Sequence, residues 1–282
     1  MLYYKYSDYL KNKYGEKVYK LPVNLPVTCP NRLNGDGCAF CAGAGTGFEA
    51  MAAVVPVTEQ LTRTRQMITR KYHANKYIAY FQNYTNTFLP PDRFRSYLME
   101  ATRIPGVVEI SVSTRPDCVS AEYLDIMRDI RAMTGIQMNV ELGLQTANYH
   151  TLQMIDRGHG LAEFIDAVLR IKSYTGISIC THVILNLPGD TAADAKETAR
   201  ILTALGVDIV KLHSLYIARN TRLCDWYENG KITVCSKEEY FERVITFLEQ
   251  IPETVAVERM FSRIPEKDAV FCNWGCSWWR LR

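Results

Sequence analysis

The sequence contains no run of eighteen apolar residues, so it lacks the hydrophobic segment that a membrane-spanning helix requires. Met1 leads into a polar stretch rather than the apolar core of a secretory signal. Glycine and proline are sparse, at 16 and 11 of 282 residues, which excludes collagen-like, low-complexity and largely disordered chains. The net charge of +3 is too small to indicate a partner. We therefore expect a globular cytoplasmic protein that does not bind a membrane.

Short runs of β-branched and aromatic residues alternate with amphipathic stretches along the chain, as in repeated βα units around a parallel sheet. The predicted strands are residues 20–27, 77–81, 106–113, 137–144, 178–185 and 209–215. The predicted helices are residues 58–75, 91–102, 120–134, 161–175, 191–205 and 236–250, and a last strand-like run covers 254–260. This alternation predicts an α/β fold, a partial TIM-type (β/α)6 barrel.

No segment rich in Gly, Ser or Pro divides the chain, and no repeat of fixed period is present. We therefore expect a single domain over residues 1–282. Within it, residues 1–19 form a short N-terminal extension, residues 20–230 the barrel and residues 231–282 a C-terminal helix and tail. In a parallel barrel the reacting groups follow the carboxyl ends of the strands, so functional residues are expected there.

Nine cysteines are many for a protein in a reducing compartment, where metal binding, redox chemistry or burial is expected rather than a disulfide framework. Cys29, Cys38 and Cys41 follow the first predicted strand with the spacing C-x8-C-x2-C. Three thiolates can hold three irons of a four-iron cluster and leave the fourth iron open to a small molecule. A structural zinc with Cys118 as fourth ligand is one alternative, although Cys118 is distant in sequence and belongs to no second C-x2-C pair. Three buried cysteines without a metal are the other.

The segment from Thr28 to Cys41 resembles the cluster loop of radical S-adenosylmethionine enzymes, including Phe40 before the last cysteine. In that superfamily the three cysteines bind a [4Fe-4S] cluster, and the open iron takes the amino and carboxylate groups of S-adenosylmethionine. The common spacing there is C-x3-C-x2-C. The longer first gap with C-P-x-R is typical of the elongator-protein-3-like branch. We expect this chain to lack the acetyltransferase domain of those relatives.

Later segments resemble the same branch in the same order. Residues 113–117 are similar to E-T-R-P-D with Ser113 in the acidic position, and residues 141–146 and 157–159 are similar to E-x-G-x-Q-S and R-G-H. Residues 182–189 and 211–221 resemble H-x-M-x-x-L-P and K-x-Y-P-x-x-V-x-x-G-T. The resemblance implies that S-adenosylmethionine is bound by residues of these segments: Ser113, Glu141, Gln145, Arg157, His182 and Leu215.

The chemistry of two of these side chains agrees with that role, because an amide can bond ribose hydroxyls and a guanidinium can pair with a carboxylate. One segment departs from the superfamily. Many members end the second strand in a Gly-Gly pair that passes the methionyl amine, whereas this chain has Phe-Gln-Asn-Tyr-Thr-Asn-Thr at residues 81–87. We expect Gln82 or Asn83 to approach the same region.

Two basic segments suit phosphate contact and base stacking on a structured RNA, although a solvated helix face would look the same. Residues 1–20 carry five lysines against two acids, with tyrosines interleaved, and residues 57–76 carry five basic residues against one acid. The resemblance favours RNA, because elongator-like enzymes act on the wobble uridine of transfer RNA.

The resemblance thus implies an enzyme with a [4Fe-4S] cluster and S-adenosylmethionine, whose 5′-deoxyadenosyl radical abstracts hydrogen from a uridine side chain in tRNA. It also implies flavodoxin or ferredoxin as electron donor. Whether the enzyme is a transferase or an oxidoreductase stays open. The alternatives are a small-molecule substrate, as in the porphyrin-forming relatives, and a zinc-stabilised RNA-binding protein without catalysis.

Overall fold

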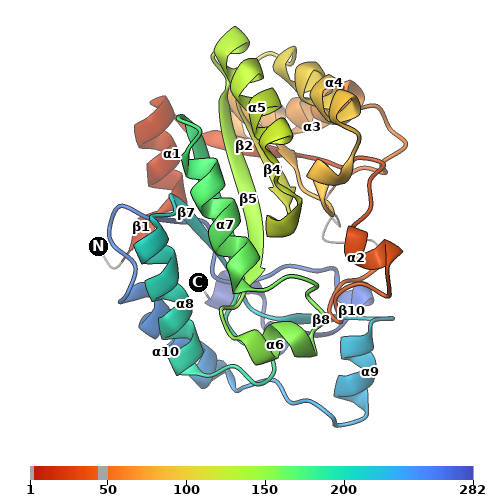
Figure 1. The fold of residues 1–282 in the computed structure, drawn as a ribbon, viewed down its shortest axis with the longest axis vertical. Coiled ribbons are helices and arrows are strands. Elements are labelled where there is room, and N and C mark those ends of the chain that lie inside the picture. Colours follow the sequence, from red (N-terminus) through yellow and green to blue (C-terminus); the bar gives the residue numbers. More distant parts are fainter. Residues whose placement is uncertain (1–2, 44–49, 282) are drawn as a thin grey trace.

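The computed structural model describes residues 3–43 and 50–281, and its centre is one curled, open parallel sheet (Figure 1). The strand order is β1-β9-β7-β6-β5-β4-β3-β2, and each neighbouring pair is parallel. The strands are β1 Tyr4–Lys5, β2 Val18–Val23, β3 Lys76–Phe81, β4 Val107–Thr114, β5 Gln137–Gln145, β6 Ile177–Ile184, β7 Ile209–His213 and β9 Ala256–Val257. The predicted half-barrel is confirmed, and β1 and β9 extend it at one edge.

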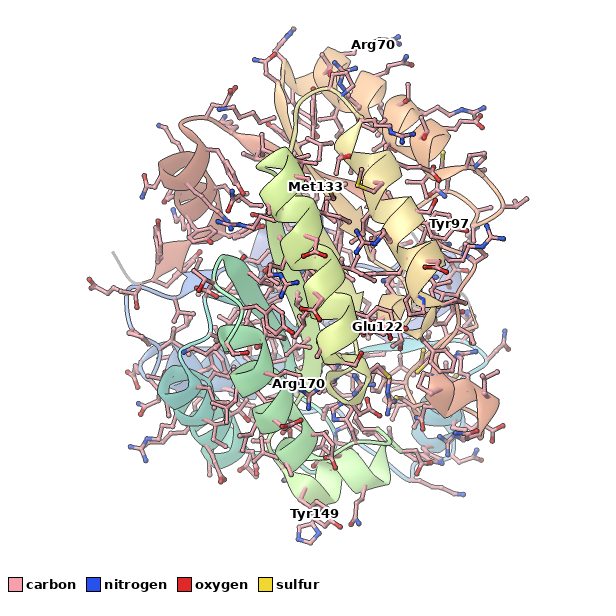
Figure 2. All side chains as sticks on the ribbon, turned by 45° about the horizontal axis from the view of Figure 1, so that its top comes forward. Arg70, Tyr97, Glu122, Met133, Tyr149 and Arg170 are labelled. Carbon is pink, nitrogen blue, oxygen red and sulfur yellow. The ribbon has the colours of Figure 1, made fainter. Side chains whose placement is uncertain are left out.

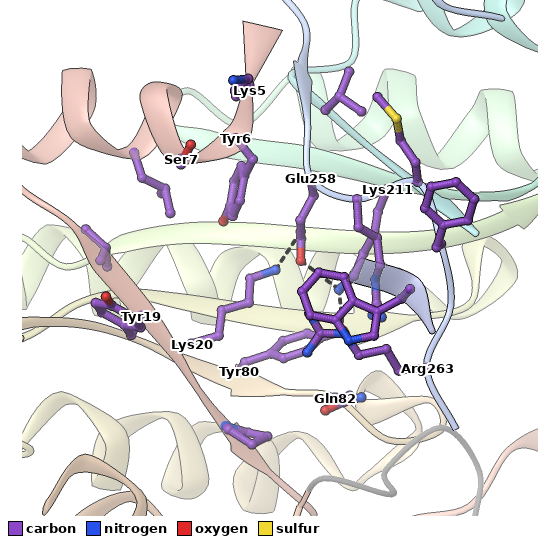
Figure 3. Close-up of a pocket in the computed structure, with 18 of the residues that line it drawn as sticks. Lys5, Tyr6, Ser7, Tyr19, Lys20, Tyr80, Gln82, Lys211, Glu258 and Arg263 are labelled. Atoms are coloured by element: carbon purple, nitrogen blue, oxygen red, sulfur yellow. Dashed lines mark hydrogen bonds and ion pairs between the residues drawn. The ribbon is translucent and has the colours of Figure 1, made fainter. Parts of the chain in front are cut away.

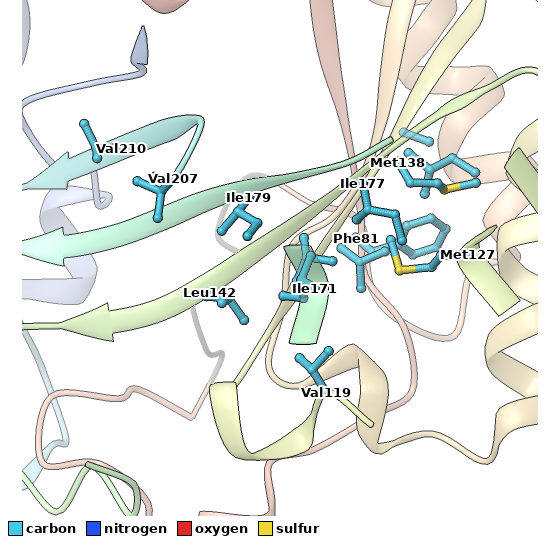
Figure 4. Close-up of a cluster of buried hydrophobic side chains, with 14 of the residues drawn as sticks. Phe81, Val119, Met127, Met138, Leu142, Ile171, Ile177, Ile179, Val207 and Val210 are labelled. Atoms are coloured by element: carbon cyan, nitrogen blue, oxygen red, sulfur yellow. The ribbon is translucent and has the colours of Figure 1, made fainter. Parts of the chain in front are cut away.

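Six long helices cover the outside of the sheet (Figures 1 and 2). They are α3 Val57–Tyr72, α4 Pro91–Thr102, α5 Ala121–Thr134, α7 Leu161–Lys172, α8 Ala192–Leu205 and α10 Lys237–Leu248. Each buries the apolar stripe that its sequence period predicts. Figure 4 shows Met127 of α5 and Ile171 of α7 against sheet residues such as Phe81, Ile177 and Ile179, all buried.

Three of the helices, α5, α8 and α10, start one residue later than the sequence predicts. Ser120, Thr191 and Ser236 have extended backbone angles and are the N-caps of α5, α8 and α10. At α10 the Ser236 hydroxyl accepts from the amide of Glu239 at 3.1 Å, and the Glu239 carboxylate accepts from the amide of Ser236 at 2.7 Å. These reciprocal bonds satisfy amides that the first helical turn leaves unpaired.

The sequence did not predict several shorter elements. They are α1 Tyr6–Tyr14, α2 Pro30–Leu33, α6 Tyr149–Met154, α9 Arg222–Glu228, α11 Trp278–Leu281, and the antiparallel pair β8 Tyr216–Ala218 and β10 Ala269–Cys272. Helix α1 contacts β2 at one edge of the sheet and β1 and β9 at the other, so it bridges the open side of the half-barrel. Among the described residues, no helix is long and apolar enough to cross a membrane.

Candidate functional site

The three predicted cluster cysteines converge at the carboxyl end of the sheet, in the loop after β2. They line one cavity of about 120 Å³. Polar side chains on or directly after β3, β4, β5 and β6, together with Arg157 from the segment after α6, line the same cavity. The side chains from the strands include Gln82, Ser113, Glu141, Gln145 and His182. The topology of a parallel barrel therefore gathers residues that are distant in sequence into one site.

Each cysteine sulfur receives an N–H group from a different arginine. The pairs are Arg115 Nη1 to Cys29 Sγ at 3.8 Å, Arg157 Nη1 to Cys38 Sγ at 3.5 Å, and Arg32 Nη2 to Cys41 Sγ at 3.6 Å. Burial raises the pKa of the Cys41 thiol above its ordinary value, although the Arg32 guanidinium opposes that rise. The thiolate forms that bind iron thus gain positive charge directly beside each sulfur.

Two of these arginines also carry buried donors without a partner among the described residues. The Nε atoms of Arg32 and Arg157 are buried, and no described residue accepts their hydrogen. A buried donor left unpaired is costly, so a site with two of them favours an anionic or acceptor-rich group. Three convergent thiols, three guanidinium groups and these donors fit a cluster and an amino-acid-bearing cofactor.

The segment after α6 holds the cysteine loop in place. The Asn31 side chain donates to the carbonyl of Asp156 at 2.6 Å and to Cys38 Sγ at 3.6 Å. Gly158 has a left-handed φ of 74°, and a Cβ there would lie 2.4 Å from Asn31 Oδ1. The R-G-H pattern therefore needs its glycine because the cysteine loop passes directly against that backbone.

The E-x-G-x-Q pattern at the end of β5 has a similar explanation. The Arg157 side chain donates through Nη2 to the carbonyl of Gly143 at 2.7 Å, and a Cβ on Gly143 would lie 2.7 Å from that nitrogen. Gln145 has a left-handed φ of 79° where the β5–β6 register shifts. The irregularity ends regular pairing at the position where Gln145 lines the cavity.

Glu141 lies in a charge network that we call the ion tetrad: Lys20, Glu141, Lys211 and Glu258. Lys20 Nζ lies 2.7 Å from an oxygen of each glutamate, and Lys211 Nζ lies 3.1 Å from the other oxygen of each. Figure 3 shows Lys20, Lys211 and Glu258 of this network. Burial opposes ionisation of Glu141, but Lys20 and Lys211 outweigh it and hold the pKa of Glu141 well below its usual range. The two ammonium groups balance the two carboxylates.

Two stacked histidines continue from this network. His182 Nε2 lies 2.6 Å from a Glu141 oxygen, and His213 Nε2 lies 3.3 Å from His182 Nδ1. Burial and the nearby Lys211 lower the pKa of His182, so both the geometry and the charges suit a neutral ring. Glu141, Cys180 and His182 also place ligand atoms within 4.8 Å of one another. The two ammonium groups on Glu141 repel a cation, so we assign no metal there.

All of the predicted site residues except Asn83 line the cavity described above or its neighbour. Leu215 lines an adjoining cavity of about 100 Å³ together with Gln82, Gln145 and His182. Asn83 lines neither, and its side chain donates to Asn24 Oδ1 at 3.0 Å. Of the two alternatives at the end of the second predicted strand, Gln82 is therefore the one that reaches the site.

Sequence reasoning did not assign a role to the residues that surround the cysteines and balance the charges. They are Asn31, Arg32, Arg115, Lys20, Lys211 and Glu258. Arg32 and Arg115 stand within the quoted C-P-x-R and T-R-P-D patterns, so these patterns could have identified them as site residues. In the basic segment at residues 1–20, Lys20 belongs to the ion tetrad, and the exposed Lys13 donates to Glu109 at 2.8 Å. Two of its five lysines are therefore paired with acids of the protein, and its role in binding RNA stays a prediction.

Comparison with known proteins agrees with this site. The model of the radical SAM superfamily matches residues 23–202, and the model of the Radical_SAM C-terminal domain matches residues 207–282. YtqA of Bacillus subtilis is 31% identical over 282 residues, covering 99% of this chain and 87% of YtqA. The tRNA uridine(34) acetyltransferase of Methanocaldococcus infernus is 28% identical over 162 residues, covering 56% of this chain and 29% of that protein.

A solved structure supports the fold. The structure of Elp3 from Methanocaldococcus infernus superposes with a TM-score of 0.70 at 17% identity, covering 92% of this chain and 61% of that one. The superfamily uses a [4Fe-4S] cluster and S-adenosylmethionine, the two groups that the convergent cysteines and their polar neighbours fit. With its curled parallel sheet, its three cysteines in one cavity and these matches, the chain belongs to the radical SAM superfamily.

Proposed function

We propose that this radical SAM enzyme modifies a uridine side chain at the wobble position of a tRNA. The observation that supports it most directly is the position of the cluster cavity beside a larger cavity of about 440 Å³, with Gln82 lining both. A reacting group in the larger cavity would lie next to the site where the cofactors bind. Residues of helix α1 and of the C-terminal segment line that space.

The residues of the cluster cavity have distinct roles in this proposal. Cys29, Cys38 and Cys41 hold the cluster, while Arg157 and Gln145 orient the carboxylate and ribose of S-adenosylmethionine. The bound cluster and S-adenosylmethionine together supply a 5′-deoxyadenosyl radical. Ser113, Glu141, His182 and Leu215 complete the proposed binding site, and Gln82 faces the side from which substrate approaches.

The tRNA substrate is inferred from two relatives. The matched acetyltransferase is named for tRNA uridine 34, and the Elp3 structure shares the half-barrel. This chain covers 29% of the first and 61% of the second, so only part of each protein is shared. We therefore propose the same type of nucleoside but not the acetyl-dependent reaction, and favour a side chain that is already installed on the base.

The test is formation of 5′-deoxyadenosine by anaerobically purified protein, given a chemical reductant, S-adenosylmethionine and bulk tRNA from a strain lacking this gene. We expect turnover that depends on tRNA, is lost after ribonuclease treatment, and changes the mass of one uridine nucleoside. If turnover persists after ribonuclease treatment when a small-molecule extract is present, the substrate is a small molecule rather than tRNA. A colourless, zinc-containing protein would leave only the RNA-binding alternative.

A further inference from the structure

The segment at residues 82–87, which follows β3 where many superfamily members carry a Gly-Gly pair, is a braced turn. Asn86 is fully buried, and its Nδ2 lies 3.0 Å from the carbonyl oxygen of Phe81 and 3.2 Å from that of Asn83. The same nitrogen lies 2.8 Å from the carbonyl oxygen of Ser113 on β4. Because these bonds satisfy backbone acceptors inside the protein, they fix the path of the turn.

Tyr84 stands within this turn in a conformation that bulky side chains seldom adopt. Its φ of 53° lies in the left-handed region, where the Cβ atom crowds the backbone. Such a residue costs free energy and persists only where the surrounding structure holds it. Tyr84 also lines the cluster cavity together with Cys29 and Cys41. The strained residue is therefore placed directly at the cluster site.

The side chain of Tyr84 contacts the cysteine loop at two points. Its hydroxyl donates to the carbonyl of Gly43, just beyond the last cysteine. The guanidinium carbon of Arg32 lies 5.6 Å from the centroid of its ring, which is a cation–π contact. The turn after β3 thus holds both the end of the cysteine loop and one of the three guanidinium groups beside the sulfurs.

Arg32 is enclosed between Tyr84 and the last cysteine. Its Nη2 lies 2.7 Å from the carbonyl oxygen of Cys41, 2.6 Å from that of Ala42 and 3.6 Å from Cys41 Sγ. Its aliphatic stem passes against Gly37, where a Cβ atom would lie 2.9 Å from Arg32 Cγ. With the stem and the carbonyl bonds on one side, the Tyr84 ring on the other keeps the guanidinium against the sulfur.

We propose that Tyr84 is a positioning residue of the cluster site, which holds the Arg32 guanidinium beside Cys41 Sγ and thereby raises the reduction potential of the cluster and slows its loss of iron. Reduction adds a negative charge, and a cationic N–H donor beside a sulfur favours the more negative form. This inference concerns the cofactor site and does not depend on tRNA as the substrate.

The test is a double-mutant cycle on anaerobically reconstituted holoprotein without S-adenosylmethionine. Tyr84→Leu removes the ring and is expected to shift the potential, measured by a redox titration followed by electron paramagnetic resonance, to a more negative value. Iron loss to a chelator is expected to become about tenfold faster. In an Arg32→Met background, the same Tyr84→Leu change is expected to leave the potential unchanged, because the ring then has no guanidinium to hold.

Two further variants separate the ring from the hydroxyl and from the backbone strain. Tyr84→Phe keeps the ring over Arg32 and is expected to keep a potential close to that of the wild type. Tyr84→Asn removes the ring but tolerates the left-handed backbone, so it is expected to show the lower potential even if Tyr84→Leu does not fold. A drop in Tyr84→Phe as large as that in Tyr84→Asn would contradict the role of the ring.

Tyr174→Leu is the matched control. The guanidinium carbon of Arg128 lies 5.9 Å from the Tyr174 ring centroid, and the Tyr174 hydroxyl donates to the carbonyl of Ala121 at 3.4 Å, but Tyr174 is not part of the cluster cavity. Its potential and iron loss are expected to match the wild type. An unchanged potential in Tyr84→Leu and Tyr84→Asn, or an equal shift with and without Arg32, would overturn the proposal. A wild type without iron would instead contradict the cluster itself.

Discussion

The wall of the cluster cavity and the ion tetrad lie close together in the half-barrel, yet they differ in whether their charged groups are paired within the protein. In the cavity wall three guanidinium groups face three thiols, and two buried Nε donors find no acceptor among the described residues. In the tetrad two lysines and two glutamates satisfy one another, and Ser111 and His182 add bonds to Glu141 at 2.7 and 2.6 Å. The first region offers unpaired donors to a ligand, whereas in the second the charges of the described residues balance one another.

The largest expected effect comes from removing a sulfur from the cavity wall. Cys38→Ala is expected to abolish the cluster, because two remaining protein ligands do not hold it. Iron and sulfide analysis with an anaerobic visible spectrum measures the effect, from about four irons per chain in the wild type to near none. Cys235→Ala is the matched control, because Cys235 lies outside the cluster cavity. Equal iron in the wild type and Cys38→Ala would show that the cysteines are structural.

Substitutions in the tetrad are expected to lower the free energy of unfolding rather than the iron content. Glu141→Gln leaves two buried ammonium groups facing one carboxylate, and breaking a buried pair in this way costs about 3–5 kcal/mol. Chemical denaturation followed by circular dichroism measures this free energy. Glu258→Gln is expected to cost less, because the Glu258 side chain is 12% exposed and that of Glu141 is fully buried. Unchanged stability in Glu141→Gln would contradict the structural role of Glu141 in the tetrad and leave it only the proposed role in binding S-adenosylmethionine.

The difference between the two regions also explains what the sequence could predict. The six main strands and six long helices follow from local periodicity and caps, and the cysteines from their spacing. The tetrad left no such signal as a charge network. Glu141 and Lys211 stand within quoted patterns, but Lys20 and Glu258 are 238 positions apart, and only the fold of the curled sheet brings them together. Helix α1 was missed for a related reason, because its Lys13 and Tyr14 both bind Glu109, which lies on β4.

A smaller effect is expected when a guanidinium of the cavity wall is replaced without loss of charge. Arg157→Lys keeps a cation but cannot reach Cys38 Sγ and the Gly143 carbonyl with one planar group. Loss of such a supporting contact typically weakens metal binding by about 10- to 100-fold. The rate of iron loss to a chelator measures it, with Arg93→Lys on α4 as control. Equal rates in Arg157→Lys and the wild type would mean that Arg157 serves the cofactor alone.

The smallest expected effect is the pH dependence that the cavity wall imposes on His159. Burial, together with Arg157 and Arg115, lowers the pKa of His159 to about 3. Its Nδ1 lies 3.2 Å from the Gly160 carbonyl, which suits a neutral ring that donates there. Below the ordinary histidine pKa of about 6.5, the unfolded chain binds a proton that the folded chain does not, so stability falls as the pH is lowered.

At pH 5.5 the free energy of unfolding lost through His159 amounts to about 1.4 kcal/mol relative to neutral pH. A glutamine side chain cannot titrate, so His159→Gln is expected to remove that part of the loss, whereas His150→Gln at an exposed position should retain it. Unfolding midpoints of the three proteins at pH 7.5 and 5.5 measure the difference. An identical loss of stability in His159→Gln and the wild type would mean that burial and the two guanidinium groups do not lower the pKa of His159.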